Sequence, residues 1–308
     1  MDHLEETTAA VTPREESRWL ARSPLAGMVL ILAATACFST MQVLIRTLAL
    51  DVPVVEVAFF RSVFGLALQA PLIFWFGFAA VKTSRVRLHV VRGTVHAISM
   101  VLFFIGLTMV PMAEATSLEF AAPILSTVIA ILFLGEAVHA RRLFALGAGV
   151  CGVLIVVRPG FESISTGQLL ILVSVALWAA CQLMIRELAK TESSFVQGVY
   201  MAAVFTPLTL LASLPVWVWP DLKSLAGMLV VAIVATAGTW LYGEAFRRAE
   251  MSAILPLEST KLIWSVSYGW IFFSEQPEVL TLVGGMIIFS AAAYITIREA
   301  QLARVKGV

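Results

Sequence analysis

Charged residues are scarce in this sequence. Lys, Arg, Asp and Glu together make up 13% of its 308 residues, whereas 60% are hydrophobic. A soluble domain of this length cannot bury so much apolar surface, so the composition predicts an integral membrane protein. The formal net charge is only +1, which argues against nucleic acid as a partner.

The motifs of common enzymes and metal sites are also absent. The sequence has no Walker-type glycine loop, no HExxH, no GxSxG and no paired aspartates, and only His96 of its four histidines lies well inside an apolar run. The cysteines Cys37, Cys151 and Cys181 lie in separate hydrophobic segments without metal-ligand spacing, so we expect them to be packing residues. The sequence therefore predicts neither an enzyme nor a protein that holds a metal or a cofactor.

Long apolar runs dominate the rest of the chain. They predict an all-α integral membrane protein with ten transmembrane helices joined by short loops. Residues 1–24 lack the basic start and apolar core of a cleaved signal peptide, so we expect a flexible cytoplasmic tail there and a cytoplasmic C-terminus over 299–308. The expected spans are 25–45, 54–78, 89–109, 112–134, 142–158, 167–186, 195–217, 225–246, 252–273 and 278–298.

The distribution of Lys and Arg predicts the orientation. The flanks on the side of both termini carry 15 of them, whereas the opposite side carries only Arg46, Arg158 and Lys223. Cytoplasmic loops hold the excess of positive charge, so both termini should be cytoplasmic, as an even number of spans also requires. Short loops and the lack of a eukaryotic sorting motif favour a bacterial inner membrane.

The chain also contains an internal duplication. Residues 27–49 align without a gap with residues 167–189, so that Gln42 matches Gln182, and further on Leu118-Glu119 matches Leu257-Glu258. The predicted repeats, 25–158 and 167–298, have five spans each, and an odd number requires the second copy to insert upside down. Inverted repeats are typical of alternating-access transporters, which bind their substrate between the repeats near the middle of the membrane.

Several motifs resemble a known family. They are VEVAFF (55–60) with Arg61, HVVRG (89–93), AEATSLEFAAP (113–123) and FLGE (133–136). Together with the two five-span halves, they resemble the EamA-type branch of the drug/metabolite transporter superfamily, and within it most closely the carriers described for S-adenosylmethionine. Other members of that branch are linked to riboflavin, amino acids or carboxylates. The resemblance implies a basket of ten helices around a central cavity and secondary transport without ATP.

Two carboxylates are the strongest site candidates. Helical rise places Glu119 ~12 Å below one membrane boundary and Glu258 ~10 Å above the other. A charge at such a depth needs a partner or a water-lined cavity. These acids either bind a cationic substrate group or exchange protons, or each is held in a structural hydrogen bond or salt bridge. Lys261 lies one helical turn beyond Glu258, so it either neutralises that acid or contacts the substrate.

Two basic side chains are further candidates. Arg61 lies ~10 Å inside its span, where it either holds a substrate carboxylate or, as we favour, pairs with Glu119 or Glu56. Arg92 is expected to reach the cytoplasmic interface. His96, four residues further, either titrates near neutral pH or is a packed neutral histidine, and the second alternative is favoured.

Aromatic and amide side chains inside the spans complete the candidate site. Aromatic faces in a cavity stack on flat rings or hold cations, although packing and lipid contact are commoner roles. The repeat-related glutamines are expected to line the cavity. These candidates are Trp178, Trp240, Tyr242, Trp264, Gln42 and Gln182.

The leading functional prediction is a secondary active transporter, with protons as a candidate coupling ion. Acids in both halves favour a small zwitterionic or cationic substrate, such as an amino acid or a derivative like S-adenosylmethionine. One alternative is a carrier of riboflavin or of an organic anion, which would use Arg61 and Lys261. Another is a membrane scaffold subunit without transport. The sequence fits either a monomer or a homodimer.

Overall fold

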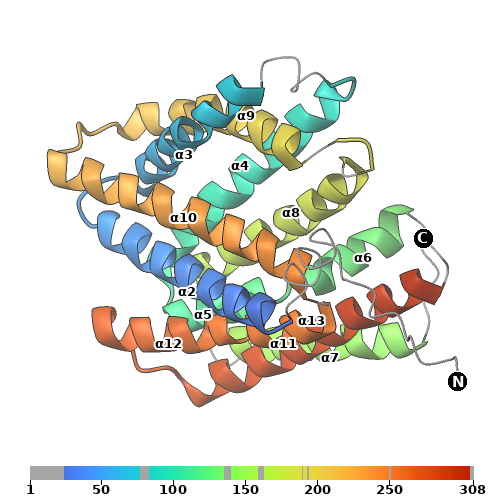
Figure 1. The fold of residues 1–308 in the computed structure, drawn as a ribbon. Coiled ribbons are helices and arrows are strands. Elements are labelled where there is room, and N and C mark those ends of the chain that lie inside the picture. The colour runs from blue at the N-terminus through green and yellow to red at the C-terminus, as the bar shows by residue number, and fades with distance from the viewer. Residues whose placement is uncertain are drawn as a thin grey trace, which may run out of the picture.

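The computed structural model describes residues 24–76, 83–134, 140–158, 163–188, 190–192, 194–249 and 251–305, and every regular element in these ranges is helical (Figure 1). The predicted tail up to residue 23 and residues 306–308 lie outside the described residues. The helices are α2 (Pro24–Leu48), α3 (Val54–Phe76), α4 (Val86–Met109), α5 (Met112–Glu119), α6 (Ala122–Leu134), α7 (Ala140–Val157), α8 (Thr166–Leu188), α9 (Ser194–Ser213), the 3-10 turn η2 (Leu214–Val216), α10 (Leu222–Arg248), α11 (Met251–Glu258), α12 (Thr260–Phe273) and α13 (Val279–Val305).

The predicted membrane class is confirmed. Within the described residues, seven helical segments are long and apolar enough to cross a membrane, and they belong to α2, α3, α4, α8, α9, α10 and α13. The apolar part of α7, Leu143–Val157, is shorter. The segments predicted as the fourth and ninth spans are each divided into two shorter helices, α5 with α6 and α11 with α12. The number of ten spans therefore stays a prediction.

The division between α5 and α6 follows from Pro123. A proline ring clashes with the carbonyl group of the fourth residue before it, which here is Glu119, and it leaves that carbonyl without a donor. The helix accordingly ends at Glu119 and restarts at Ala122, which places Pro123 in the first turn of α6, where proline is tolerated.

The division between α11 and α12 has a different origin. Pro256 lies inside α11, and the helix ends two residues later at Glu258. The hydroxyl groups of Ser259 and Thr260 donate to the backbone carbonyl groups of Pro256 and Leu257. Such side-chain bonds satisfy carbonyl groups that a continuing helix would have used, and so they stabilise the break.

Helices that match in the predicted repeat have matching neighbours. Helix α2 packs against α10, and its repeat counterpart α8 packs against α4, the counterpart of α10. Helix α3 packs against α9, and α7 against α13. The last pair approaches closely at Gly152 and Gly284, where a Cβ on either residue would lie within 3.0 Å of the other's carbonyl oxygen. Small residues allow such backbone approach between membrane helices.

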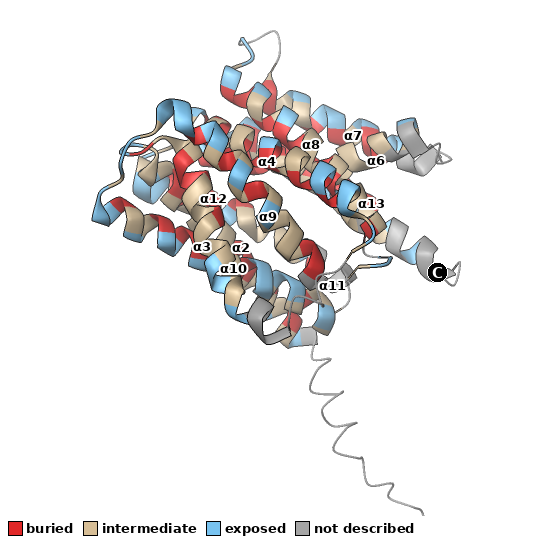
Figure 2. Cartoon of the chain, turned by 90° about the horizontal axis from the view of Figure 1, so that it is seen from above, coloured by how far each residue is buried: buried red, intermediate tan, exposed pale blue. Residues whose placement is uncertain are grey.

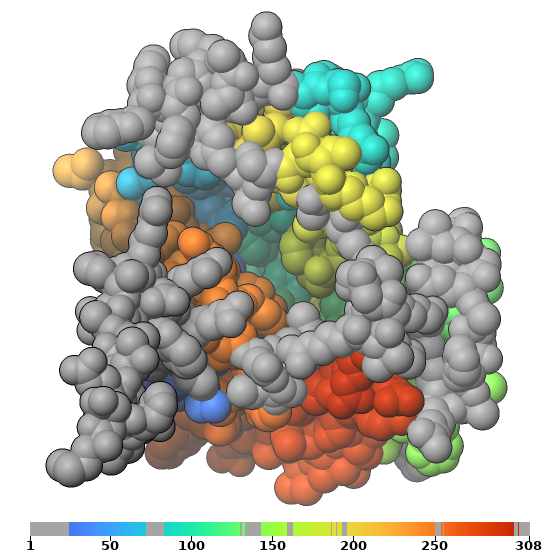
Figure 3. Space-filling view, turned by 45° about the vertical axis from the view of Figure 1, so that its right-hand side comes forward, coloured from blue at the N-terminus to red at the C-terminus, as the bar shows by residue number. Residues whose placement is uncertain are grey.

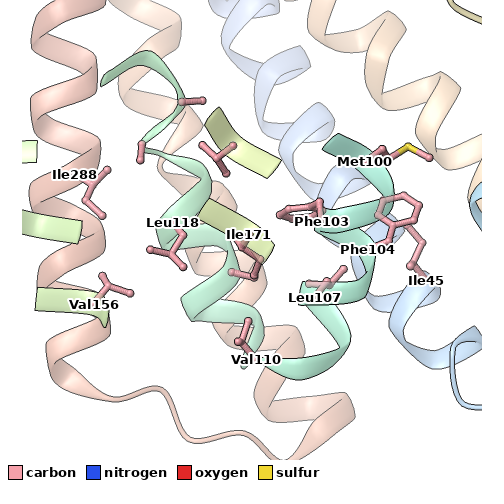
Figure 4. Packing of buried hydrophobic residues seen from close by; sticks show 14 of the residues in the cluster. Ile45, Met100, Phe103, Phe104, Leu107, Val110, Leu118, Val156, Ile171 and Ile288 are labelled. Carbon is pink, nitrogen blue, oxygen red and sulfur yellow. The ribbon is translucent and has the colours of Figure 1, made fainter. Parts of the chain in front are cut away.

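The buried core lies between the helices rather than around them (Figure 2). Its centre is α4, whose Phe103, Phe104 and Leu107 pack with Ile45 of α2 and Ile171 of α8 (Figure 4). Many large apolar side chains are instead exposed on the outside of the bundle, as a surface in contact with lipid requires. This core holds α2, α4, α5 and α8 together, and these helices carry many of the candidate site residues.

Candidate functional site

One face of α2 is polar along most of its length. Thr35, Ser39, Gln42 and Arg46 are spaced four, three and four residues apart, which places them on one side of the helix. The hydroxyl of Thr35 lies 3.0 Å from that of Thr260, and Ser39 donates to the backbone carbonyl of Lys261 at 3.4 Å. This face therefore points to α12, the second half of the divided helix. Sequence reasoning had considered only Gln42 on this face, although the spacing of the others was a readable signal.

Glu119 accepts hydrogen bonds from two other helices. Its Oε2 atom lies 2.7 Å from Nζ of Lys261 in α12 and 3.0 Å from Nε2 of Gln42 in α2. Nearby, Thr116 of α5 and Ser265 of α12 lie 2.6 Å apart through their hydroxyl groups, and both are fully buried. The structure thus brings together three predicted site residues, Gln42, Glu119 and Lys261, in a cluster without net charge.

The alternative in which Lys261 neutralises Glu258 is not matched by a salt bridge between these two residues in the described chain. It assumed one continuous helix, in which residues three apart lie on the same face. The chain divides at Ser259, so Glu258 belongs to α11 and Lys261 to α12. Lys261 instead makes its salt bridge with Glu119.

Glu258 has a single hydrogen-bond partner within the described chain. The hydroxyl of Tyr242 in α10 donates to its carboxylate at 2.6 Å. The Tyr242 ring packs against Phe38 and Phe246, with ring centroids 6.1 and 4.9 Å apart. Tyr242 is 37% exposed, whereas Gln42 beside Glu119 is 1% exposed. Two predicted site residues, Tyr242 and Glu258, thus form a second pair.

Arg61 pairs with neither predicted acid. Nη1 of Arg61 lies 3.0 Å from the sulfur of Met100, and its buried Nε has no hydrogen-bond partner. Glu119 is bound by Lys261, and Glu56 accepts a hydrogen bond from the backbone N–H of Val218. The favoured pairing of Arg61 is therefore wrong, because Glu119 binds Lys261 and Glu56 binds the backbone of Val218 instead.

His96 is packed between aromatic rings. Its ring centroid lies 4.7 Å from that of Trp178 in α8 and 5.6 Å from that of Phe205 in α9. Arg92, predicted to reach the interface, is instead only 5% exposed and donates to the backbone carbonyl of Gln197 at 3.3 Å. An acceptor on α9 thus holds Arg92 inside the bundle. Arg61, His96 and Trp178 form the third group of predicted residues.

Three candidates stay outside these groups. Trp240 is 65% exposed, and Gln182 is also exposed, so the two repeat-related glutamines have different surroundings. Trp264 packs at 6.1 Å from Tyr268, and its buried indole N–H has no partner in the described chain. No hydrogen bond joins these three to the other candidates over the described ranges.

An ion pair that sequence reasoning missed lies at the end of the bundle where α2 ends and α5 begins. Arg46 makes a salt bridge with Glu275, in the loop between α12 and α13, and its guanidinium lies 4.5 Å from the Phe273 ring. Glu275 also accepts a hydrogen bond from the backbone N–H of Met112 at 2.9 Å. This Arg46–Glu275 pair joins the first and the last thirds of the chain. Its signal was Arg46 itself, which continues the polar face of α2.

An apolar groove on the surface does not coincide with the candidate residues. It has a volume of about 500 Å³ and runs between α7 and α13, with a lining that is apolar except for Ser290. A hollow on another face has walls from α10 (orange) and from α8 and α9 (yellow), with α3 (blue) and α4 (teal) behind them (Figure 3). These helices carry Tyr242, Arg61, His96 and Trp178, so charge and aromatic faces favour the hollow over the groove as the site for a polar substrate.

Comparison with known families decides the assignment. The model of the EamA-like transporter family matches residues 25–158 and again residues 165–297. The chain belongs to the EamA-like transporter family. The resemblance to the drug/metabolite transporter superfamily is thereby confirmed, and this EamA-like protein is an integral membrane protein of a family of small-molecule transporters rather than enzymes.

Named relatives of this EamA-like protein transport different compounds. It is 28% identical over 272 residues to the pseudopaline exporter CntI of Pseudomonas aeruginosa, which covers 86% of this chain and 94% of the relative. It is 27% identical to a riboflavin transporter of Brucella anthropi, over 82% and 91% of the two chains. It is also 27% identical to an S-adenosylmethionine uptake transporter of Rickettsia bellii, over 79% and 84%.

A solved crystal structure has the same fold. It superposes with a TM-score of 0.59 at 18% identity and covers 91% of this chain and 99% of its own. At that identity the likeness concerns the fold alone.

Proposed function

We propose that this protein is a secondary carrier that moves a small zwitterionic or cationic metabolite across the inner membrane by alternating access. The observation that carries the proposal is that Glu119 and Glu258 each end an eight-residue helix in matching parts of the chain. Divided helices commonly form the substrate and ion sites of secondary transporters, because their free ends and nearby side chains are available for binding. A purely structural acid would not require a break in either helix.

The proposed architecture consists of two inverted halves, 25–158 and 167–298, with five spans each and both termini in the cytoplasm. Three observations support it: matching helices have matching neighbours, the family model matches the chain twice, and Lys and Arg are concentrated on one predicted side. Reporter fusions after Arg298 and in the loop that precedes α10 test the orientation. A cytoplasmic signal from the first and a periplasmic signal from the second are expected.

The proposed mechanism opens and closes the end of the bundle where α2 ends and α5 begins. The Arg46–Glu275 pair and the bond from Met112 to Glu275 hold α2, α5 and the α12–α13 loop together, so they close that end. Opening it requires these bonds to separate. Lys261 lies close enough for its charge to act on both Glu119 and Glu258. Protonation of one acid would therefore favour the interaction of Lys261 with the acid that stays charged. This makes protons the proposed coupling ion.

The test is uptake into proteoliposomes from a defined mixture of S-adenosylmethionine, riboflavin and amino acids, with and without a proton gradient. Mass spectrometry identifies what accumulates. Glu119→Gln and Glu258→Gln are expected to abolish uptake of the accepted compound while the protein remains folded. Glu244→Gln is the matched control, because Glu244 pairs with Arg247 and Arg248 near the end of α10.

Two outcomes would contradict this proposal. Unchanged uptake in both acid variants would exclude the site, and a folded protein that transports none of these compounds would favour the scaffold alternative. Preferred uptake of riboflavin or an organic anion would instead support the other carrier alternative. Arg61 favours that alternative, since it has no acid partner in the described chain.

A further inference from the structure

Arg61 differs from three other cations of the chain, each of which has an acid partner. Arg46 binds Glu275, Arg158 binds Glu278 and Lys261 binds Glu119. Within the described chain, Arg61 has only the sulfur of Met100 as a hydrogen-bond acceptor, and thioether sulfur is a weak acceptor. A buried charge without a counter-charge destabilises a protein, so such a group is retained where a ligand supplies the missing acceptor.

The surroundings of Arg61 are positive as well as apolar. Both Arg61 and Arg92 lie close enough to His96 for their charges to act on its ring. Arg92 is 5% exposed, and its described hydrogen bonds go to the backbone carbonyl of Gln197 and the sulfur of Met201. The acid Glu192 lies 3.9 Å from Nε2 of His89 and accepts a hydrogen bond from Thr83, and no salt bridge of the described chain joins it to Arg61 or Arg92. The group around His96 therefore carries uncompensated positive charge.

Flat rings form the other side of this group. The His96 ring lies between Trp178 and Phe205, and its buried Nδ1 has no hydrogen-bond partner in the described chain. Trp178 is only partly buried. Helices α3, α4, α8 and α9, which supply these side chains, border the hollow in Figure 3. A ligand bound beside His96 would meet a guanidinium and aromatic faces.

We propose that Arg61, with His96 and Trp178, forms a subsite for the carboxylate and the flat ring of an aromatic or heteroaromatic carboxylic acid. This inference rests on the proposed carrier function and specifies the carboxylate end of its zwitterionic substrate. A carboxylate fits a guanidinium fork through two parallel hydrogen bonds, and the adjoining ring would pack against the indole of Trp178. Arg92 adds a second positive charge that favours an anionic group.

The test is thermal unfolding of the purified full-length protein in detergent with three matched probes. Phenylacetate has both the charge and the ring, phenylacetamide lacks the charge, and cyclohexylacetate lacks the aromatic ring. At a concentration ten times its Kd, phenylacetate is expected to raise the unfolding midpoint by roughly 2–4 °C. The other two probes are expected to have a smaller effect.

Variants separate a binding role of Arg61 from a structural one. Arg61→Gln and Arg61→Met should remove the response to phenylacetate, Arg61→Lys should keep part of it, and Trp178→Ala should weaken it. Lys223→Gln, which removes an exposed charge at the start of α10, should respond as the wild type does. Without a probe, Arg61→Met should unfold at the same temperature as the wild type or higher, because it removes an unpaired buried charge.

Specific results would overturn the inference. One is equal stabilisation of the wild type by phenylacetate and phenylacetamide. The other is an Arg61→Met variant that unfolds at a lower temperature than the wild type without a probe and still responds to phenylacetate as the wild type does. Proteoliposome uptake keeps the two proposals apart. Uptake without carboxylate selectivity would contradict the proposed subsite and support the carrier function. Carboxylate binding without any uptake would support the subsite and contradict the carrier function.

Discussion

Glu119 and Glu258 have matching places in the chain but different partners. Each ends a short helix and precedes a second one, α6 or α12. Glu119 accepts hydrogen bonds from Lys261 and Gln42, whereas Glu258 accepts one from Tyr242. The first acid is therefore part of an ion pair, and the second has no salt bridge in the described chain.

Sequence differences between the halves explain this contrast. The offset of 139 residues that relates Glu119 to Glu258 also relates Ala122 to Lys261. The first half thus has an alanine where a lysine partner for Glu258 would stand. Gln182, the counterpart of Gln42, is exposed. Similar backbones in the two halves can therefore carry different charges, so that one acid has a salt bridge and the other has none in the described chain.

Lys261→Met is expected to give the largest effect, because it breaks the ion pair that distinguishes the two acids. The Glu119 side chain is 25% exposed, and removing its cation should cost about 3–5 kcal/mol. The measurement is the thermal unfolding midpoint in detergent. The double variant Lys261→Met/Glu119→Gln removes both charges and should recover most of the stability. Equal losses in the single and double variants would contradict the explanation.

Replacing the two glutamines tests the asymmetry directly. Gln42→Leu removes a hydrogen bond to the carboxylate of Glu119 and should lower the free energy of unfolding by about 1.5–3 kcal/mol. Gln182→Leu, at the matching position, should change it by no more than ~0.5 kcal/mol, because that side chain is exposed and makes no described hydrogen bond. Equal effects on the unfolding midpoint would show that the halves are more alike than their hydrogen bonds indicate.

Tyr242→Phe should have a smaller effect of about 1 kcal/mol, because it removes the one described hydrogen bond to Glu258 from a partly exposed tyrosine. The unfolding midpoint is again the measurement. Tyr294→Phe is a suitable control, since Tyr294 is 44% exposed on α13. A loss as large as that of Lys261→Met would mean that Glu258 depends on Tyr242 as strongly as Glu119 depends on its lysine.

The smallest effect is expected at the start of α10, the helix that carries Tyr242. The carboxylate of Asp221 accepts a hydrogen bond from the backbone N–H of Ser224 at 2.8 Å, whereas Arg85 at the start of α4 makes no such cap. Asp221→Ala should therefore lower the unfolding midpoint slightly at neutral pH, while Asp221→Asn, which also caps helices, should retain most of the stability. Equal losses in both variants would exclude a capping role.

The same residue predicts a pH dependence. Hydrogen bonds from Ser224 lower the pKa of Asp221 below its ordinary value of 3.8. A lowered pKa means that the stabilisation is present above pH 3.8 and is lost as the pH falls through the folded-state pKa. The difference between the wild type and Asp221→Ala should consequently shrink in strong acid. A difference that stays constant down to that range would contradict the role of the charge.

Much of the fold could be read from local patterns. Apolar runs predict the membrane helices because hydropathy depends only on neighbouring residues, and the motifs around Arg61 and Glu119 identified the family. The polar face of α2 was also readable, because Thr35, Ser39, Gln42 and Arg46 follow helical spacing. The break at Glu119 follows from Pro123 by simple sterics, although the predicted span of 112–134 was continuous.

The partners of the buried charges could not be read in the same way. Lys261 binds an acid 142 residues earlier rather than one three residues away, because a break at Ser259 separates it from Glu258 and helix packing brings α12 to α5. Arg61 lacks an acid because Glu119 and Glu56 are bound elsewhere. The sequence alone thus determined the helices, the family and the candidate residues. The tertiary structure decided which charges are paired, since pairing depends on contacts between distant segments.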